Sequence, residues 1–231
     1  MNLSTPPVSF SAAVLAGGRS TRMGTDKAFV LWRGRTLLEH QLSTLRALGP
    51  NALLVSRPQP DSGRRPDGRV EGAMCNVQDS DGPSAVPVGG VPSPRDPSLL
   101  EPRIVFDERP DCGPLGGLGA LLKAIQTSHL IVLAVDMPRV TPVFLRLLSA
   151  RCAPGVGSAV RTETRWEPLV AVYPRELLPW IERRLVDGDR SLQKLLDEAC
   201  LAGQIDPVRS TSPRLFANIN TPAELTALAN T

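Results

Sequence analysis

The sequence predicts an α/β fold, a three-layer α/β/α sandwich built around a mostly parallel central sheet. Two observations support this prediction. Short apolar runs alternate with segments of helical periodicity along most of the chain. The strongest run, residues 130–135, is apolar throughout, and such a strand is typical of a parallel sheet covered by helices on both faces.

The first elements are a strand, a helix and a second strand. Residues 10–16 contain a run of small apolar residues that predicts a buried strand. Thr36 and the glutamate three residues later have the spacing of a capping box, and the Gly-Pro pair at residues 49–50 is a typical helix end. A strand at residues 52–55 follows, in the order of a right-handed crossover between parallel strands.

Further strands and helices are expected downstream. The apolar runs and β-rich segments predict strands at residues 104–106, 130–135, 157–160, 169–173 and 215–219. Helical spacing and capping residues predict helices at residues 118–125, 141–148, 176–186 and 191–200, and a last one beginning at Thr221. A second glycine-rich stretch, residues 113–119, leads into the first of these helices.

Residues 58–102 differ from the rest of the chain. They hold nine prolines and six glycines among 45 residues and no aromatic residue. This proportion exceeds the roughly 25–30% that is typical of low-complexity segments, so no regular structure is predicted there. We therefore expect residues 1–231 to form one domain with a Pro/Gly-rich insertion at 58–102.

Composition excludes several classes of protein. The net charge of +3 is too small to indicate a nucleic-acid partner, and no apolar run approaches the length of a membrane span. The four cysteines lie far apart, without the spacing of a zinc site or a disulfide framework. These observations favour a cytoplasmic protein that binds neither nucleic acid nor a membrane.

A glycine-rich, basic loop follows the first strand directly. Residues 15–27 combine three glycines with Arg19, Arg22 and Lys27. Glycines let backbone N–H groups approach an anion, and the cations add charge, so this loop predicts a phosphate-binding site. Neither the Walker spacing nor the G-x-G-x-x-G dinucleotide fingerprint is present, which argues against those two classes.

Two carboxylates, Asp107 and Asp136, directly follow predicted strands. In an open α/β sheet, ligands bind beyond the carboxyl ends of the strands, so both should lie on one rim with the glycine-rich loop. Mg²⁺ demands oxygen ligands and bridges nucleotide phosphates. We therefore expect Asp136 to bind Mg²⁺, and Lys27 and Arg22 to offset charge on the phosphates. The histidines, His40 and His129, are interpreted as structural.

The loop carries a family resemblance. Residues 15–27 resemble the L-A-G-G-x-S-x-R-M-G-x-D-K signature of molybdenum cofactor guanylyltransferases, which have a Rossmann-like, glycosyltransferase-A-like nucleotidyltransferase fold. Four later motifs are also similar and occur in the family's order: C-G-P-L-G-G at 112–117, V-D-M-P at 135–138, E-P-L at 167–169 and N-I-N-T-P at 218–222. The resemblance implies transfer of GMP from GTP to the terminal phosphate of molybdopterin, with Mg²⁺ and release of pyrophosphate.

The resemblance also implies roles for single residues. By position, Leu15, Ala16 and Gly17 would contact the guanine nucleotide, Lys27 its phosphates, Asp107 the nucleotide, and Asp136 both the nucleotide and Mg²⁺. Asn218 and Asn220 resemble asparagines on the pterin side. Ser56 departs from the family, which often has a nucleotide-binding asparagine there.

Two alternatives stay open on sequence alone. One is a sister nucleotidyltransferase that uses CTP or a sugar-phosphate acceptor, although the cytidylyl group resembles L-A-A-G where this chain has L-A-G-G. The other is a non-catalytic GTP-binding adaptor. For the leading interpretation, proteins that deliver molybdopterin or mature molybdoenzymes are the expected protein partners.

Overall fold

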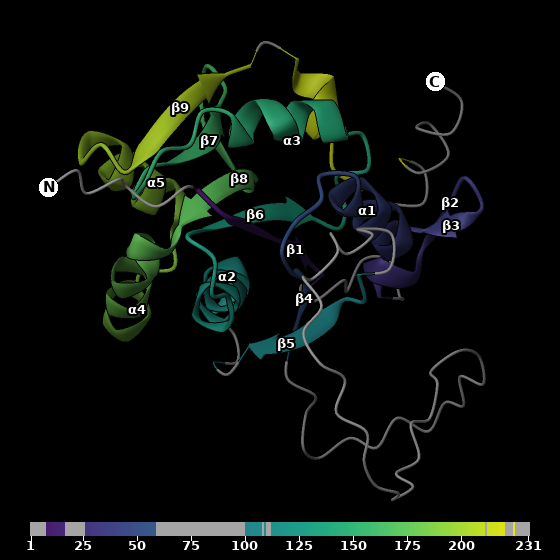
Figure 1. The fold of residues 1–231 in the computed structure, drawn as a ribbon, viewed down its shortest axis with the longest axis horizontal. Coiled ribbons are helices and arrows are strands. Elements are labelled where there is room, and N and C mark those ends of the chain that lie inside the picture. Colours follow the sequence, from purple (N-terminus) through teal and green to yellow (C-terminus); the bar gives the residue numbers. More distant parts are fainter. Residues whose placement is uncertain are drawn as a thin grey trace, which may run out of the picture. The chain divides into compact units, whose positions relative to one another are not determined.

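The computed structural model describes residues 8–16, 26–58, 100–107, 109, 112–210, 212–219 and 224. A seven-stranded sheet lies at the centre of this part of the chain. The strand order is β5-β4-β1-β6-β8-β7-β9 (Figure 1). The strands are β1 (Phe10–Leu15), β4 (Leu53–Pro58), β5 (Arg103–Asp107), β6 (His129–Ala134), β7 (Gly157–Arg161), β8 (Trp166–Pro174) and β9 (Ile205–Arg209). Only β8 runs antiparallel to its neighbours, so the expected mostly parallel sheet is confirmed.

β1 lies between β4 and β6 and sets the register of both. Leu15 pairs with Ser56 on one side and with Ala134 on the other. β5 continues the parallel arrangement beyond β4, where Asp107 pairs with Pro58. The carboxyl ends of four strands therefore meet at one edge of the sheet, which we call the rim.

Helices cover both faces of this sheet. α1 (Leu37–Arg46) and α3 (Pro142–Ser149) pack on one face, and α2 (Gly113–Ala124), α4 (Leu178–Asp187) and α5 (Leu192–Leu201) pack on the other (Figure 1). Successive side chains of β1 alternate between the two cores: Val14 packs with α1 and α3, and Leu15 with α2. The three-layer α/β/α prediction is thus confirmed. No helix in the described part of the chain is long and apolar enough to cross a membrane.

Three helices, α1, α3 and α5, begin at a capping side chain, whereas α2 begins at Gly113, before the predicted start at 118, and α4 at Leu178, after the predicted start at 176. The Thr36 hydroxyl accepts a hydrogen bond from the Glu39 N–H at 3.1 Å, and the Glu39 carboxylate accepts one from the Thr36 N–H at 2.8 Å. This reciprocal pairing satisfies two backbone donors of the first turn of α1, and it lowers the pKa of Glu39. At α3 only one of the two bonds is present: the Thr141 hydroxyl accepts from the Phe144 N–H at 3.3 Å, and Pro142 is the first helical residue.

The structure differs from the sequence prediction in several short elements. A hairpin of β2 (Leu31–Trp32) and β3 (Arg35–Thr36), and the edge strand β9, were not expected. The predicted strand at 215–219 is wrong, because the chain there forms a 3₁₀ turn, η4 (Pro213–Phe216), and then an irregular segment. Two further 3₁₀ turns are η1 (Lys27–Phe29) and η3 (Arg175–Leu177).

Two predicted segments fall largely outside the described residues. Within the 58–102 insertion, Pro58 ends β4 and only residues 100–102 are described at the far end. The helix expected from Thr221 is described at Glu224 alone, which is helical.

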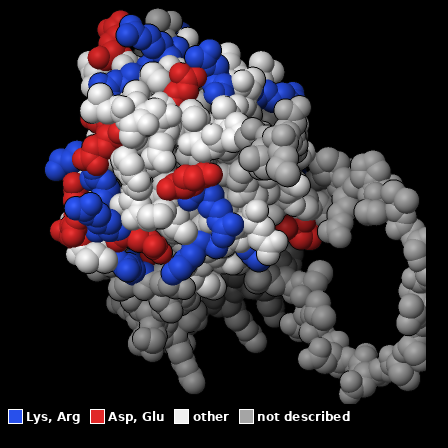
Figure 2. Space-filling model, turned by 60° about the vertical axis from the view of Figure 1, so that its left-hand side comes forward, with Lys and Arg blue, Asp and Glu red and all other residues white. Residues whose placement is uncertain are grey.

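Charged residues of both signs alternate on the face that Figure 2 shows. On α4, Arg183 forms an ion pair with Asp187 at 3.6 Å, and Arg184 one with Asp189 at 2.8 Å. These two arginines of α4 are therefore compensated by carboxylates close to them in sequence.

His129, the first residue of β6, is buried within the fold. Its Nε2 donates to the Val156 carbonyl at 3.1 Å, and its Nδ1 lies 2.9 Å from the Ser128 hydroxyl. Burial lowers the pKa of His129, although the hydrogen bond to Val156 opposes this effect. The folded protein therefore holds this histidine neutral at a pH where the unfolded chain binds a proton.

This difference predicts a pH-dependent stability. Since the folded-state pKa is below the unfolded value of about 6.5, stability is complete above that pH and falls as the pH drops below it. From pH 7.5 to 5.5, the free energy of unfolding should fall by up to about 1.4 kcal/mol. Urea denaturation at both pH values measures this loss, which His129→Gln should reduce. An unchanged pH dependence in the variant would contradict the assignment.

Candidate active site

The carboxyl end of β1 leads into the rim, and a short 3₁₀ turn follows the basic loop there. Leu15 and Ala16 are buried at the end of the strand. Asp26 caps η1 by accepting a hydrogen bond from the Ala28 N–H at 3.0 Å, and its carboxylate pairs with Arg57 on β4 at 2.8 Å. This ion pair fastens the end of the loop to the end of β4.

Lys27 and Asp136 meet at the rim. The Lys27 Nζ lies 3.0 Å from the Asp136 Oδ2, although the two residues are 109 positions apart. Each side chain is only 18% exposed, so solvent screens this pair less than a surface salt bridge. The structure thus places a cation and a carboxylate side by side where the sequence predicted phosphate and metal binding.

The segment that carries Asp136 is held from several sides. Gln41 on α1 donates to the Ala134 carbonyl at 2.9 Å, and the adjacent His40 donates from Nε2 to the Pro138 carbonyl at 2.9 Å. The Ile219 N–H donates to the carbonyl of Asp136 itself at 2.9 Å. Two consecutive helical residues therefore fix the backbone on either side of Asp136, and the carboxy-terminal segment fixes it in the middle.

These contacts refine the sequence interpretation. His40 was interpreted as structural and Gln41 was not singled out, because nothing local in α1 indicates hydrogen bonds to residues more than ninety positions away. Gln41 is fully buried. Its polar side chain among the apolar positions of α1 is the one sequence signal that could have indicated its hydrogen bond.

The glycines of α2 bring this helix close to the rim. A Cβ at Gly116 would lie 2.4 Å from the Asp107 Oδ2, and one at Gly117 would lie 2.8 Å from the Ser56 Oγ and 2.9 Å from the Leu15 Cδ2. No side chain fits at either position without displacing these neighbours. The glycine-rich stretch therefore forms the start of α2 and lets its backbone pack directly against the ends of β5, β4 and β1.

Asp107 and Asp136 lie on the same rim but not in the same place. β5 and β6 are separated by β4 and β1, which corresponds to three strand spacings or about 14 Å. Asp107 accepts a hydrogen bond from the Arg109 N–H at 3.0 Å. The two carboxylates cannot share one metal ion, but they can contact the two ends of an extended ligand that lies across the strand ends.

The E-P-L motif lies at the start of β8, on the same side of the sheet as Asp136. Val170 pairs with Leu133 in the antiparallel ladder between β8 and β6, so Glu167 lies three residues further toward the rim. Glu167 is buried and pairs with Arg165 at 3.0 Å. The sequence indicates no role for this glutamate, and the register between β8 and β6 places it near the rim.

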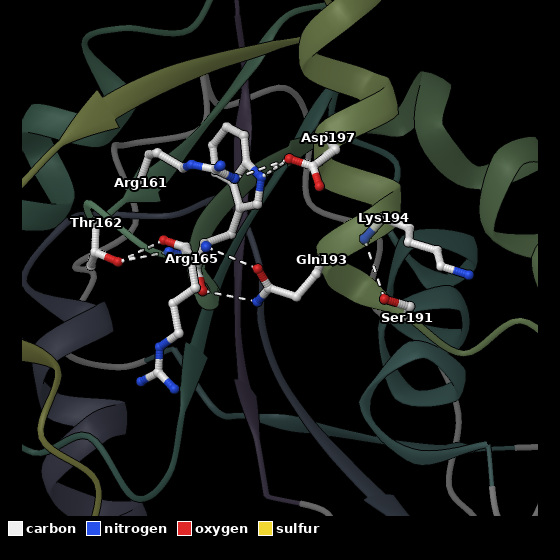
Figure 3. A network of polar contacts seen from close by, with 8 residues as sticks. Arg161, Thr162, Arg165, Ser191, Gln193, Lys194 and Asp197 are labelled. Carbon is white, nitrogen blue, oxygen red and sulfur yellow. Dashed lines mark hydrogen bonds and ion pairs between the residues drawn. The ribbon is translucent and has the colours of Figure 1, made fainter.

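A polar network holds the start of β8 against α5 (Figure 3). The Trp166 N–H donates to Gln193 at 2.9 Å, the Gln193 amide donates back to the Trp166 carbonyl at 2.9 Å, and the Trp166 indole N–H donates to Asp197 at 2.8 Å. Arg161 pairs with the same Asp197 and lies over the Trp166 ring. This network fixes the backbone next to Glu167.

The remaining candidate residues divide between described and undescribed parts of the chain. Asn218 is exposed in the segment next to Ile219, close in sequence to the hydrogen bond with Asp136. Gly17, Arg22 and Asn220 lie outside the described residues. Ser56 lies buried at the end of β4, in register with Leu15.

Residues 12–205 match the family model described as the MobA-like NTP transferase domain. The chain belongs to this family. A probable molybdenum cofactor guanylyltransferase from Opitutus terrae is 34% identical over 80% of this chain and 77% of its own length. A molybdenum cofactor guanylyltransferase from Pseudomonas fluorescens is 33% identical over 100% of this chain and 98% of its own length. The resemblance seen in the sequence is therefore confirmed, and this NTP transferase is an enzyme of the nucleotidyltransferase class.

Solved structures confirm the fold. Molybdopterin-guanine dinucleotide biosynthesis protein A from Archaeoglobus fulgidus aligns with a TM-score of 0.62 and 21% identity, covering 95% of this chain and 96% of its own. A 2-C-methyl-D-erythritol 4-phosphate cytidylyltransferase from Thermus thermophilus aligns with a TM-score of 0.59 and 18% identity, covering 97% and 100%. Since proteins named for different nucleotides share this fold, the fold alone does not select the base.

The packing of α2 gives a testable prediction with a matched control on the same helix. Gly117→Ala should lower kcat/KM for the nucleotide by about tenfold to a hundredfold, because the new methyl group displaces Leu15 and Ser56 at the rim. In Gly119→Ala, the methyl group meets only side chains of α4, those of Ile181 at 3.2 Å and Leu185 at 3.5 Å, so near-normal kinetics are expected. Both variants exchange glycine for alanine in α2, so equal kinetics in the two would contradict this explanation.

Proposed function

We propose that this enzyme transfers GMP from GTP to the terminal phosphate of molybdopterin, forming the guanine dinucleotide cofactor and releasing pyrophosphate. The observation that carries the proposal is the Lys27–Asp136 pair at the rim, 3.0 Å apart, beside the end of β1. The relatives named as molybdenum cofactor guanylyltransferases support the choice of substrates. A cytoplasmic location, favoured by the cysteine pattern, belongs to the same proposal.

In this reaction, an oxygen of the acceptor phosphate attacks the α-phosphorus of GTP, and the bond to the leaving pyrophosphate breaks. The protein's task is to align the two reactants and to stabilise the charge that develops on the phosphate oxygens. Lys27 supplies an ammonium group at the rim, and Arg22 is the second cation proposed for this role. Leu15, Ala16, Gly17 and Asp107 would hold the nucleotide along the strand ends.

Asp136 fits Mg²⁺ by the chemistry of its side chain. The described residues contain no group of three or more potential metal ligands, which agrees with an ion held chiefly by the substrate. Mg²⁺ in nucleotide-dependent enzymes is commonly bound by one or two carboxylates, phosphate oxygens and water, so a single aspartate suffices. When bound, the ion would neutralise phosphate charge and polarise the phosphoryl group.

The ion pair also prepares both side chains for their ligands. Lys27 and Asp136 neutralise each other in the protein alone, so neither charge is left unpaired in a partly buried position. A nucleotide phosphate offers Lys27 a new anionic partner. The backbone hydrogen bonds from Gln41, His40 and Ile219 keep the Asp136 segment in place through this exchange.

A cytidylyl reaction is the second candidate, because a cytidylyltransferase shares the fold over nearly the whole chain. The proposed reaction is tested by incubating the protein with molybdopterin, Mg²⁺ and either GTP or CTP, and detecting the product by mass. We expect the guanine dinucleotide and pyrophosphate from GTP. Product from CTP alone would favour the cytidylyl reaction, and GTP binding without any product would favour a non-catalytic adaptor.

Substitutions at the ion pair test the proposed roles. Lys27→Ala should lower turnover at saturating GTP by about 10²–10³, the typical effect of losing one electrostatic stabiliser. Asp136→Ala should abolish Mg²⁺-dependent transfer. Lys123→Ala and Asp187→Ala remove the same kinds of side chain from exposed positions and should leave the rate unchanged. Near-normal rates in the Lys27 or Asp136 variant would refute the corresponding role.

A further inference from the structure

Lys27 lies on a short element with few anchors of its own. η1 spans only Lys27–Phe29, and Asp26 is the first described residue after Ala16. Ala28 is the one buried residue of this turn. The lysine side chain is a flexible four-carbon stem, and a turn anchored by one small side chain does not fix its direction. The position of the ammonium group therefore depends on contacts made by the residues beside Lys27.

Arg57 contacts the chain on both sides of Lys27. Its Nη2 lies 2.8 Å from the Oδ2 of Asp26, the residue directly before Lys27. Its guanidinium lies over the ring of Phe29, two residues after Lys27, at 5.2 Å. A planar guanidinium group can pair with a carboxylate and lie over an aromatic ring at the same time. One arginine thus holds both residues that flank Lys27.

Arg57 has a firmer support than the turn it contacts. It belongs to β4, an interior strand between β5 and β1, and its partner in register on β5 is Phe106. The residue before it, Ser56, pairs with Leu15 at the end of β1. Side chains on strands of a scaffold are held more precisely than those on loops. The sheet therefore fixes Arg57, and Arg57 in turn fixes η1.

The contact between Arg57 and Asp26 adds little to folding. Their side chains keep 24% and 42% of their surface exposed, and ion pairs in such positions contribute little stability. The other terminal nitrogen of Arg57, Nη1, is buried and has no acceptor in the described part of the chain, which costs stability. An arginine that stabilises the fold so little points to a role in the neighbouring site.

We propose that Arg57 is a positioning residue, which acts through Asp26 and Phe29 to hold the Lys27 ammonium group at the rim. An electrostatic stabiliser must be in place before charge develops in the transition state, so losing this contact should lower kcat more than it raises KM. The effect on kcat rests on the function proposed for Lys27, whereas the positioning itself does not.

The direct test measures how well Lys27 is held, without using the transfer reaction. The chain has three lysines, and Lys123 and Lys194, which are 60% and 67% exposed, serve as internal references. The protein is treated with a limiting amount of acetic anhydride, and acetylation of each lysine is followed by peptide mass spectrometry. In the wild type, Lys27 should react more slowly than both references, because it is mostly buried and ion-paired. Equal rates would overturn the proposal.

Two variants break the contact from opposite ends. Arg57→Gln removes the guanidinium, and Asp26→Asn removes the charge but keeps a good N-cap for η1. Each should speed the acetylation of Lys27 by about threefold or more relative to the references, a change typical of coupled neighbours. Unchanged Lys27 reactivity in either variant would contradict the positioning role.

Arg161 offers a matched control for these variants. It pairs with an aspartate at 3.0 Å and lies over an aromatic ring at 4.8 Å, so it has the same two kinds of contact as Arg57. Arg161→Gln should leave the acetylation of Lys27 unchanged. An increase as large as in Arg57→Gln would show a general loosening of the protein and would overturn the proposal.

A double-mutant cycle then links the contact to catalysis. With saturating GTP and molybdopterin, Arg57→Gln should lower kcat by about tenfold in the wild type but by less than about twofold in Lys27→Ala, because Arg57 acts through Lys27. Arg57→Lys should recover part of the loss, since its ammonium can pair with Asp26 without covering Phe29 as a planar group does. An equal loss of kcat in both backgrounds would show that Arg57 acts independently of Lys27, contrary to the proposal.

The two experiments separate this inference from the proposed reaction. A wild-type protein that forms no product from GTP would count against the proposed function alone. The acetylation rates would still decide whether Arg57 holds Lys27, because they require no turnover.

Discussion

The parallel pairing of β1 with β4 on one side and β6 on the other is the constraint on which the candidate site depends. It aligns Leu15 with Ser56 and with Ala134, and so brings strand ends that are distant in sequence to one edge. Lys27 follows β1 within the chain, and Asp136 follows β6. Their contact is a consequence of strand register rather than of any local motif. A slip of β6 by one residue would turn its buried side chains to the opposite face and break this contact.

The two ends of the rim are organised by different physical means. Toward β5, the absence of side chains at Gly116 and Gly117 lets the α2 backbone fill the space beside Asp107 and Ser56. Toward β6, hydrogen bonds from α1 hold the Asp136 segment, and the Asp136 side chain keeps 18% of its surface exposed. Close packing suits the β5 end of the rim, where other ligands must be excluded. A partly exposed carboxylate with a fixed backbone suits the β6 end, where Asp136 must exchange one binding partner for another.

The sequence indicated the elements that carry local signals, and it missed those that depend on distant partners. The capping box at Thr36 and the apolar run of β6 were sufficient to place α1 and the central strand. β9 was missed because Pro207 interrupts a half-exposed edge strand, where the ladder tolerates it. The segment at 215–219 was predicted as a strand from its apolar residues, but the Ile219 N–H bonds to the Asp136 turn. The contact of His40 has no local signature, and the only signal for that of Gln41 is a polar residue on the apolar face of α1.

The position of β1 also bears on how the chain folds. Its partner β6 pairs at a separation of 119 residues, so the central strand is synthesised long before its second neighbour exists. Contacts so distant in sequence are costly in loop-closure entropy and slow the search for the native pairing. During translation, β1 can dock only against β4, and its other edge stays open until more than half of the chain has emerged. The central position of β1 assembles the rim. It also makes β1 the strand with the longest delay between its own synthesis and that of its second neighbour.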